Sequence, residues 1–348
     1  MKKNLSIDTI KRIYSLKSHN IVSLPIVILM PHSRCNCRCV MCDIWKGNNN
    51  VKQLEESDVE KLFDSLNKLN TKLVVMSGGE ALMHSNIFRL CEIIKARNIK
   101  ITLLSTGLLL KKYAIEIISK TDEVIVSLDG SREIHDKIRN IPNAFDKLKE
   151  GVQELKRLNP KFRVTGRCVI QKENFDDLPN IVEAAREIGL DQISFLTADV
   201  TTDAFNRPEL WDNQKAGEVK LSREELVRFK DVIESLINSH SNDFRTNFIA
   251  ESSDKIRRFY QYYAAYYGES KFPKMKCNAP WVSTVIEADG SVRPCFFHQV
   301  IGDIRENSLA EIINSEKSIS FRKNLDVATN SICEKCVCYL NLSPFAKL

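Results

Sequence analysis

Cysteine is the residue type whose spacing could do chemistry in this 348-residue chain. Cys35, Cys39 and Cys42 form a C-x3-C-x2-C pattern near the N-terminus, and Cys37 lies inside it. Three thiolates held this close together suit a cubane iron–sulfur cluster, and they leave one iron free to bind an external ligand. The alternative is a closed structural zinc site with Cys37 as the fourth ligand. The triplet alone does not separate these two interpretations.

A second group of cysteines lies near the C-terminus and consists of Cys277, Cys295, Cys333, Cys336 and Cys338. The residues between the first two predict a β-hairpin that turns at 288–290. Cysteines on a hairpin followed by a C-x2-C pair predict a second metal centre, either another iron–sulfur cluster or a zinc ribbon-like clip. Cys336 and Cys338 are alternative candidates for its last ligand.

Six short apolar runs between residues 24 and 200 must position the first group of cysteines. They alternate with amphipathic, helix-like stretches. Continuous apolar strands separated by helices predict a parallel sheet covered by helices, with a site at the carboxyl ends of the strands. The expected fold is therefore α/β, a partial (β/α)6 TIM-like barrel with a small C-terminal α+β domain. The expected organisation is an N-terminal helical extension (1–22), the barrel (23–210), a helical linker (211–274) and the auxiliary metal domain (275–348).

The motifs at the ends of these predicted strands resemble those of the radical S-adenosylmethionine (SAM) superfamily. The cysteine triplet follows the first strand, GGE (78–80) the second, STG (105–107) the third and SLDG (127–130) the fourth. The resemblance implies that eight residues contact SAM: Met41, Gly78, Gly79, Glu80, Ser105, Ser127, Arg139 and Leu196. It places the methionine amino group at the GGE motif, the ribose at Ser127 and the carboxylate at Arg139, whose guanidinium fork matches a carboxylate. Thr106 replaces the family's usual Asn, and Met41 replaces an aromatic residue.

The C-terminal cysteines resemble the twitch form of the SPASM domain, which binds one auxiliary [4Fe–4S] cluster. The resemblance thus implies a [4Fe–4S] cluster with bound SAM on the N-terminal triplet, an auxiliary [4Fe–4S] cluster, and a flavodoxin- or ferredoxin-type reductant. Epimerases of this superfamily use a cysteine as hydrogen donor, which makes Cys168 and Cys338 candidate catalytic residues. A plain core role is the alternative for Cys168.

The resemblance predicts an enzyme that forms a deoxyadenosyl radical and carries out a dehydrogenation or an epimerisation. A polar loop after the sixth predicted strand favours a hydroxyl- or amine-bearing small molecule; its residues are Asp199, Thr201, Thr202, Asp203, Asn206 and Arg207. The segment before the first strand is too short for a module that binds the leader of a peptide substrate, which also favours a small molecule. The alternatives are a maturase that forms thioethers or epimers in a ribosomal peptide and, more distantly, a non-enzymatic zinc-binding protein.

Composition and charge limit the kinds of partner that we expect for this protein. The net charge of +6 is spread along the chain, so no DNA partner is expected. The apolar run at 21–30 is too short to span a bilayer and lacks a cleavage site, so neither a membrane partner nor export is expected. We therefore expect a cytoplasmic protein, where eleven cysteines indicate metal chemistry more than disulfides.

Overall fold

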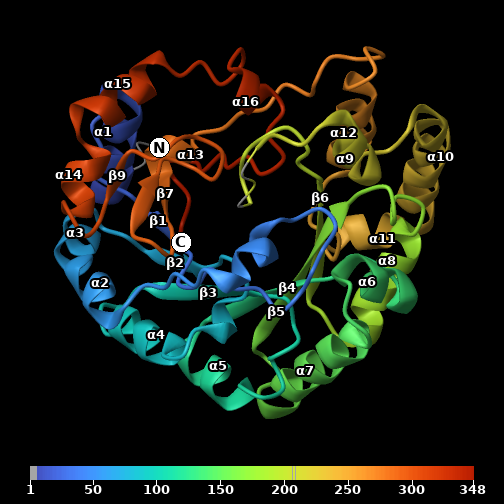
Figure 1. The fold of residues 1–348 in the computed structure, drawn as a ribbon, viewed down its shortest axis with the longest axis horizontal. Helices are drawn as coiled ribbons and strands as arrows, with labels where there is room; N and C mark the ends of the chain where they lie inside the picture. The colour runs from blue at the N-terminus through green and yellow to red at the C-terminus, as the bar shows by residue number, and fades with distance from the viewer. Residues whose placement is uncertain (1–5, 206, 208) are drawn as a thin grey trace, which may run out of the picture.

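The computed structural model describes residues 6–205, 207 and 209–348. Asn206 and the first five residues of the predicted helical extension lie outside the described residues. The six predicted strands form one parallel sheet that curves into an open barrel (Figure 1). Their bounds are β1 Ile26–Leu29, β2 Leu73–Met76, β3 Lys100–Ser105, β4 Glu123–Ser127, β5 Arg163–Ile170 and β6 Gln192–Thr197. The predicted TIM-like α/β fold is confirmed.

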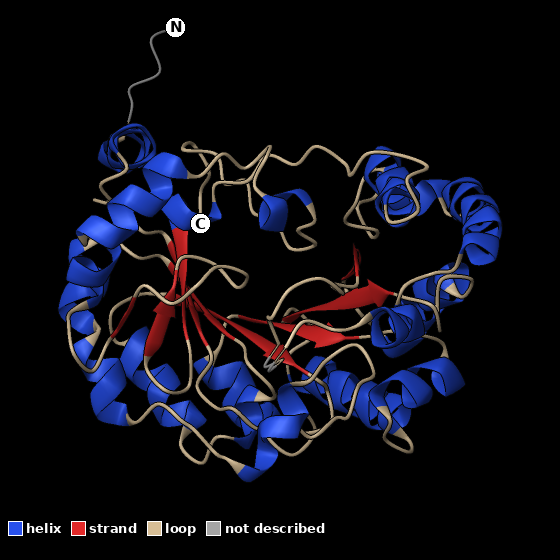
Figure 2. Cartoon of the chain, turned by 45° about the horizontal axis from the view of Figure 1, so that its top comes forward, coloured by secondary structure: helices blue, strands red, loops and turns tan. Residues whose placement is uncertain are grey.

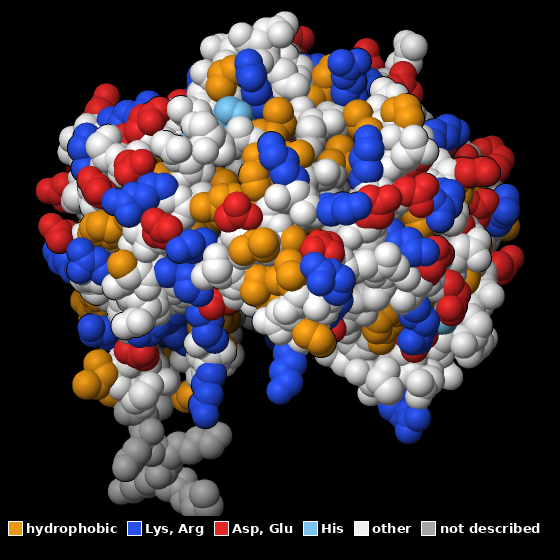
Figure 3. All heavy atoms as spheres, turned by 90° about the horizontal axis from the view of Figure 1, so that it is seen from below, with side chains coloured by type: hydrophobic (Ala, Val, Ile, Leu, Met, Phe, Trp, Pro, Cys, Tyr) orange, Lys and Arg blue, Asp and Glu red, His pale blue; other side chains and the backbone are white. Residues whose placement is uncertain are grey.

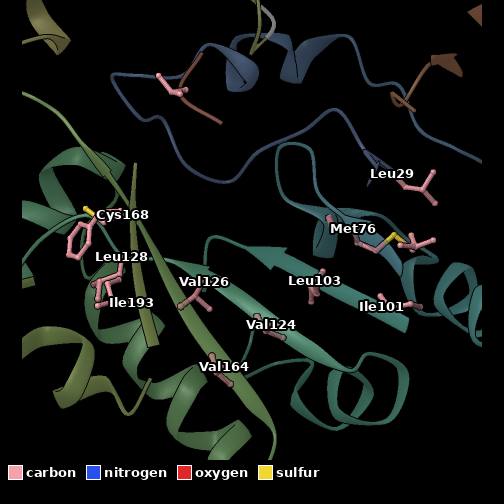
Figure 4. Packing of buried hydrophobic residues seen from close by; sticks show 14 of the residues in the cluster. Leu29, Met76, Ile101, Leu103, Val124, Val126, Leu128, Val164, Cys168 and Ile193 are labelled. Atoms are coloured by element: carbon pink, nitrogen blue, oxygen red, sulfur yellow. The ribbon is translucent and has the colours of Figure 1, made fainter. Parts of the chain in front are cut away.

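Helices cover the convex face of this sheet, and loops lie over the concave face (Figure 2). The covering helices are α2 Glu56–Lys61, α3 Phe63–Lys68, α4 Ile87–Lys95, α5 Ala114–Lys120, α6 Arg132–Arg139, α7 Ala144–Leu158 and α8 Leu178–Ile188. Alternate strand residues, among them Val124, Val126, Val164 and Ile193, pack with apolar helix residues into one continuous core (Figure 4). Because side chains alternate along a strand, the residues between them face the concave side, which we call the lumen.

The C-terminal region continues the same sheet. Strand β7 (Ser283–Ile286) pairs in parallel with β1, and β8 (Ser291–Arg293) and β9 (Gly302–Asp303) follow in antiparallel order. The resulting nine-stranded order is β6-β5-β4-β3-β2-β1-β7-β8-β9. The hairpin expected between Cys277 and Cys295 is therefore present. It also brings the C-terminal domain directly against the first barrel strand.

The remaining helices complete the C-terminal part of the molecule: α9 Asn213–Val219, α10 Arg223–Ser239, α11 Ser241–Arg245, α12 Ser253–Ala265, α13 Ala279–Val282, α14 Leu309–Ile313, α15 Glu316–Asn324 and α16 Ser331–Glu334. Helix α1 (Ile7–Ser18) packs near them, and Arg12 donates to the carbonyl of Ala346 at 2.6 Å. The four-part division of the chain stays a prediction.

Two surface properties bear on partners. On the face shown in Figure 3, basic and acidic side chains intermingle around small apolar patches. Within the described part of the chain, no helix is both long and apolar enough to cross a membrane.

Candidate active site

The loop after β1 carries the N-terminal cysteines and lies at the carboxyl ends of the strands. Cys39 is buried, whereas Cys35 and Cys42 are half-buried. Cys37 is 1% exposed and lies close to Cys35 and Cys39 in the loop. The neighbouring Cys37 thiol and the positive charge of Arg139 lower the pKa of Cys39 to about 7, whereas burial raises the pKa of Cys42 to about 12. A thiolate is the form that binds iron, so this environment suits a cluster ligand.

The GGE motif lies against the cysteine loop with no room between the two backbones. A Cβ added at Gly79 would stand 2.2 Å from the carbonyl oxygen of Arg34, and Gly78 has a φ of +113°. Only glycine permits both this approach and this conformation. The amide of Glu80 donates to the same Arg34 carbonyl at 2.8 Å, which fixes the motif beside Cys35.

Glu80 is fully buried, and the end of β3 supplies its partners. Ser105 Oγ donates to its carboxylate at 3.0 Å, and the amide and hydroxyl of Thr106 donate at 2.7 and 2.6 Å. Burial raises the pKa of Glu80, while these donors counteract the rise. The STG motif therefore positions the carboxylate of the GGE motif. Thr106 Oγ1 also lies 3.0 Å from the side-chain amide of Asn36 inside the cysteine loop, so the residue that replaces the usual Asn contacts this loop.

Arg139, at the end of α6, lies beside the cysteine loop and is paired with Asp129. Its Nη1 donates to Cys39 Sγ at 3.6 Å, and its buried Nε has no partner among the described residues. Asp129 also accepts from the amide of Val169 at 2.8 Å. Our sequence analysis did not single out Asp129, although it is the Asp of SLDG. The unpartnered Nε leaves Arg139 with donor capacity for a carboxylate ligand.

The other residues expected to contact SAM lie around the same end of the barrel. Ser127 is the last residue of β4. Leu196 pairs in register with Val169 on the neighbouring strand. Met41 and Val169 are partly buried against one small apolar cluster beyond the strand ends. Cysteine thiols, a tight glycine backbone, a buried carboxylate and a guanidinium thus lie around one end of the barrel.

The polar loop after β6 is folded onto itself. Arg207 and Asp199 form a buried ion pair of 2.7 Å, and Thr202 Oγ1 donates to the same carboxylate at 2.6 Å. Arg207 also donates to the carbonyl of Met41 at 3.4 Å, and Trp211 Nε1 donates to Asp43 at 3.0 Å. These side chains therefore tie the loop to the cysteine loop, and most of their polar atoms already have protein partners.

The five C-terminal cysteines lie on segments that adjoin α13, β8 and α16. Burial, with smaller effects from nearby Cys277 and Cys338, raises the pKa of Cys295 to about 11. Cys338 is exposed but lies near Cys295 and Cys336, so the choice of last ligand stays open. The sequence analysis missed His298, whose Nε2 lies 3.3 Å from Cys333 Sγ. The C-x2-H spacing from Cys295 was the signal that could have revealed it.

Cys168 lies apart from both cysteine groups. It is completely buried on the helix-facing side of β5, packed near Leu128 and Ile193 (Figure 4). Asn174 Nδ2 lies 3.6 Å from its sulfur. Its role as hydrogen donor stays a prediction that this placement does not support, because a donor must reach the lumen.

Comparison with known proteins places the chain in a family. The radical SAM superfamily profile matches residues 29–185, and the SPASM profile, described as an iron–sulfur cluster-binding domain, matches residues 277–337. The fold and the site thus define a radical SAM protein. The chain belongs to the radical SAM superfamily and carries a C-terminal SPASM-type domain. Its cofactors are accordingly SAM and [4Fe–4S] clusters, which decides the open choice between iron–sulfur and zinc.

Individual relatives are distant. The Fe-coproporphyrin III synthase of Methanosarcina barkeri is 28% identical over 177 residues, which cover 49% of this chain and 43% of that protein. The cysteine-type anaerobic sulfatase-maturating enzyme of Clostridium novyi is 24% identical over 345 residues, covering 91% of this chain and 86% of that protein. Streptococcus suis SuiB, solved with its precursor peptide SuiA, superposes with a TM-score of 0.63 at 18% identity, covering 94% of this chain and 72% of SuiB. The matched region spans less than half the length of the M. barkeri relative.

Proposed function

We propose that this radical SAM enzyme abstracts a hydrogen atom from a peptide or protein substrate held in the barrel lumen. The observation that supports this proposal is that the three cysteines, the GGE segment and Arg139 lie at one end of the barrel. When bound there, the cluster and SAM supply a 5′-deoxyadenosyl radical that can attack unactivated C–H bonds.

The chain's own residues have separate tasks in this proposal. Cys35, Cys39 and Cys42 hold the cluster, and Gly79 lets the GGE segment approach the cysteine loop. Glu80, held by Ser105 and Thr106, orients the ligand's ammonium group, and Arg139 receives its carboxylate. Ser127 takes the ribose, while Met41 and Leu196 cover the adenine.

A peptide substrate is favoured over a free small molecule by two observations. Three of the loop residues that suggested a hydroxyl- or amine-bearing small molecule, Asp199, Thr202 and Arg207, are buried and paired with one another. The C. novyi relative that covers most of this chain is named for maturing a sulfatase, and SuiB was solved with a precursor peptide. Dehydrogenation or epimerisation is the reaction class we propose, with a flavodoxin- or ferredoxin-type protein as the electron donor.

Anaerobic reconstitution followed by incubation with SAM and dithionite tests the proposal. We expect a brown protein with about eight irons, from two cubane clusters, that forms 5′-deoxyadenosine. A variant with Cys35, Cys39 and Cys42 all replaced by Ala should keep about four irons and form none. Cys91→Ala, in the buried core of α4, is the matched control and should keep both properties. A wild-type protein that retains its iron but leaves SAM intact would refute the proposal.

A further inference from the structure

Three polar residues form a row across the lumen face of neighbouring strands. Arg167 on β5 pairs in register with Ser127 on β4 and with Ser194 on β6. Their neighbours along the strands, Val126 and Cys168, belong to the helix-facing core. Because side chains alternate, the guanidinium of Arg167 and the hydroxyls of both serines face the lumen.

Arg167 is a half-buried cation whose side chain has no protein partner in residues 6–205, 207 and 209–348. It makes no ion pair or side-chain hydrogen bond there, and its Nε is buried without a partner. By contrast, Arg163 on the same strand pairs with Glu123 at 3.3 Å and donates to Gln192 at 3.1 Å. Withdrawing a donor from water without a partner is costly, so the buried Nε, together with Nη groups that no protein group binds, makes Arg167 a candidate for a ligand contact.

The position of Arg167 separates it from Arg139, the residue assigned to the SAM carboxylate. The Asp129–Arg139 pair is anchored at the amide of Val169, two residues further along β5. Two strand residues span roughly 7 Å, so Arg167 starts about that much deeper in the barrel. A carboxylate bound by Arg139 beside the cysteine loop therefore leaves Arg167 free for another molecule.

We propose that Arg167, flanked by Ser127 and Ser194, binds a carboxylate of the substrate. This inference rests on the proposed function, since it supplies the substrate class for the same lumen. A planar guanidinium binds a carboxylate through two parallel hydrogen bonds. An Asp or Glu side chain or the C-terminus of a peptide offers this group.

Binding of two matched probes to the SAM-loaded holoenzyme tests the inference. The probes are N-acetyl-L-glutamic acid α-amide and its neutral analogue N-acetyl-L-glutamine α-amide, titrated anaerobically by calorimetry. We expect the wild type to bind the acid at least about tenfold more tightly than the amide, as a charge-assisted bond predicts. Arg167→Gln should abolish this preference, whereas Arg167→Lys should retain part of it because it keeps the charge but loses the fork.

Two controls make the outcome specific. Arg163→Gln removes an arginine from the same strand and should leave the preference intact. Iron content, circular dichroism and SAM affinity should be unchanged in Arg167→Gln. A wild type without the preference, or a variant that keeps it, overturns the inference. A variant that weakens SAM binding also overturns it and assigns Arg167 to the cofactor. Failure of wild-type deoxyadenosine formation is a separate result that refutes the proposed function.

Discussion

Replacing Gly79 by alanine is the sharpest test of how the site is built. The new Cβ would lie 2.2 Å from the carbonyl oxygen of Arg34 and 2.6 Å from its carbonyl carbon. Both atoms are backbone, so no side-chain rotation relieves the contact. The separation is about 1.2 Å short of the 3.4 Å at which ordinary van der Waals contact begins.

The strain must move the cysteine loop or the GGE segment. Either movement breaks the 2.8 Å hydrogen bond between the Glu80 amide and Arg34 and shifts Cys35 relative to Glu80. Overpacking of this kind costs roughly 1–3 kcal/mol of folding stability. A displacement of about 1 Å between reacting groups can reduce a rate about 100-fold. We therefore expect Gly79→Ala to lose about 100-fold in 5′-deoxyadenosine formation.

The assay is chromatographic measurement of 5′-deoxyadenosine from SAM and dithionite, with iron counted in the same sample. The auxiliary cluster should be retained at about four irons, because the C-terminal cysteines are remote from Gly79 in the sequence and are held by other elements. Gly217→Ala in α9 is the matched control, since nothing lies within 4 Å of its added Cβ. If Gly79→Ala forms deoxyadenosine at the wild-type rate, the close approach of the two backbones is not what builds the site.

Three further predictions concern other parts of the molecule. Because Cys168 faces the helix layer, Cys168→Ala should lower the free energy of unfolding by about 1 kcal/mol and preserve product formation; continued deoxyadenosine formation without product would instead establish it as the hydrogen donor. His298→Gln should shift the midpoint potential of the auxiliary cluster, because hydrogen bonds to ligand sulfurs tune such potentials. The potential is measured by electron paramagnetic resonance in a variant that lacks the N-terminal cysteines. An unchanged potential would contradict a role for the 3.3 Å contact with Cys333. Arg305→Gln removes the pair that ties the C-terminal domain to α2, in which Nη2 lies 2.9 Å from the buried carboxylate of Asp58. Burial alone would raise the pKa of Asp58, but Arg305, together with the amide of Glu55, outweighs it and lowers the value. The stabilisation is therefore present above the unfolded-state pKa and lost as pH falls through the lower folded value. Urea unfolding should show a loss of roughly 1–3 kcal/mol near neutral pH that shrinks below about pH 4, and a pH-independent difference would argue against the ion pair.

The sequence predicted the six barrel strands and the cysteine groups because their signals are local. A buried parallel strand is rich in apolar residues, and so are the runs at β1 to β6, although several lumen-facing positions are polar. Cluster ligands close in the chain, such as Cys35, Cys39 and Cys42, need no long-range information to be recognised. The order of the motifs after successive strands predicted that they share one site, because the carboxyl ends of parallel strands lie at one edge of the sheet.

The tertiary structure decided which side chains remain available and which face they occupy. From the sequence, the loop residues Asp199 and Arg207 were expected to contact a polar substrate, yet they pair with each other once the chain folds. Cys168 and Arg167 are adjacent in the chain, but the strand's alternation sends the first into the core and the second into the lumen. The contact of His298 with Cys333 and the pairing of β7 with β1 join segments far apart in the chain. No local pattern encodes such contacts, because they depend on how the whole sheet is assembled.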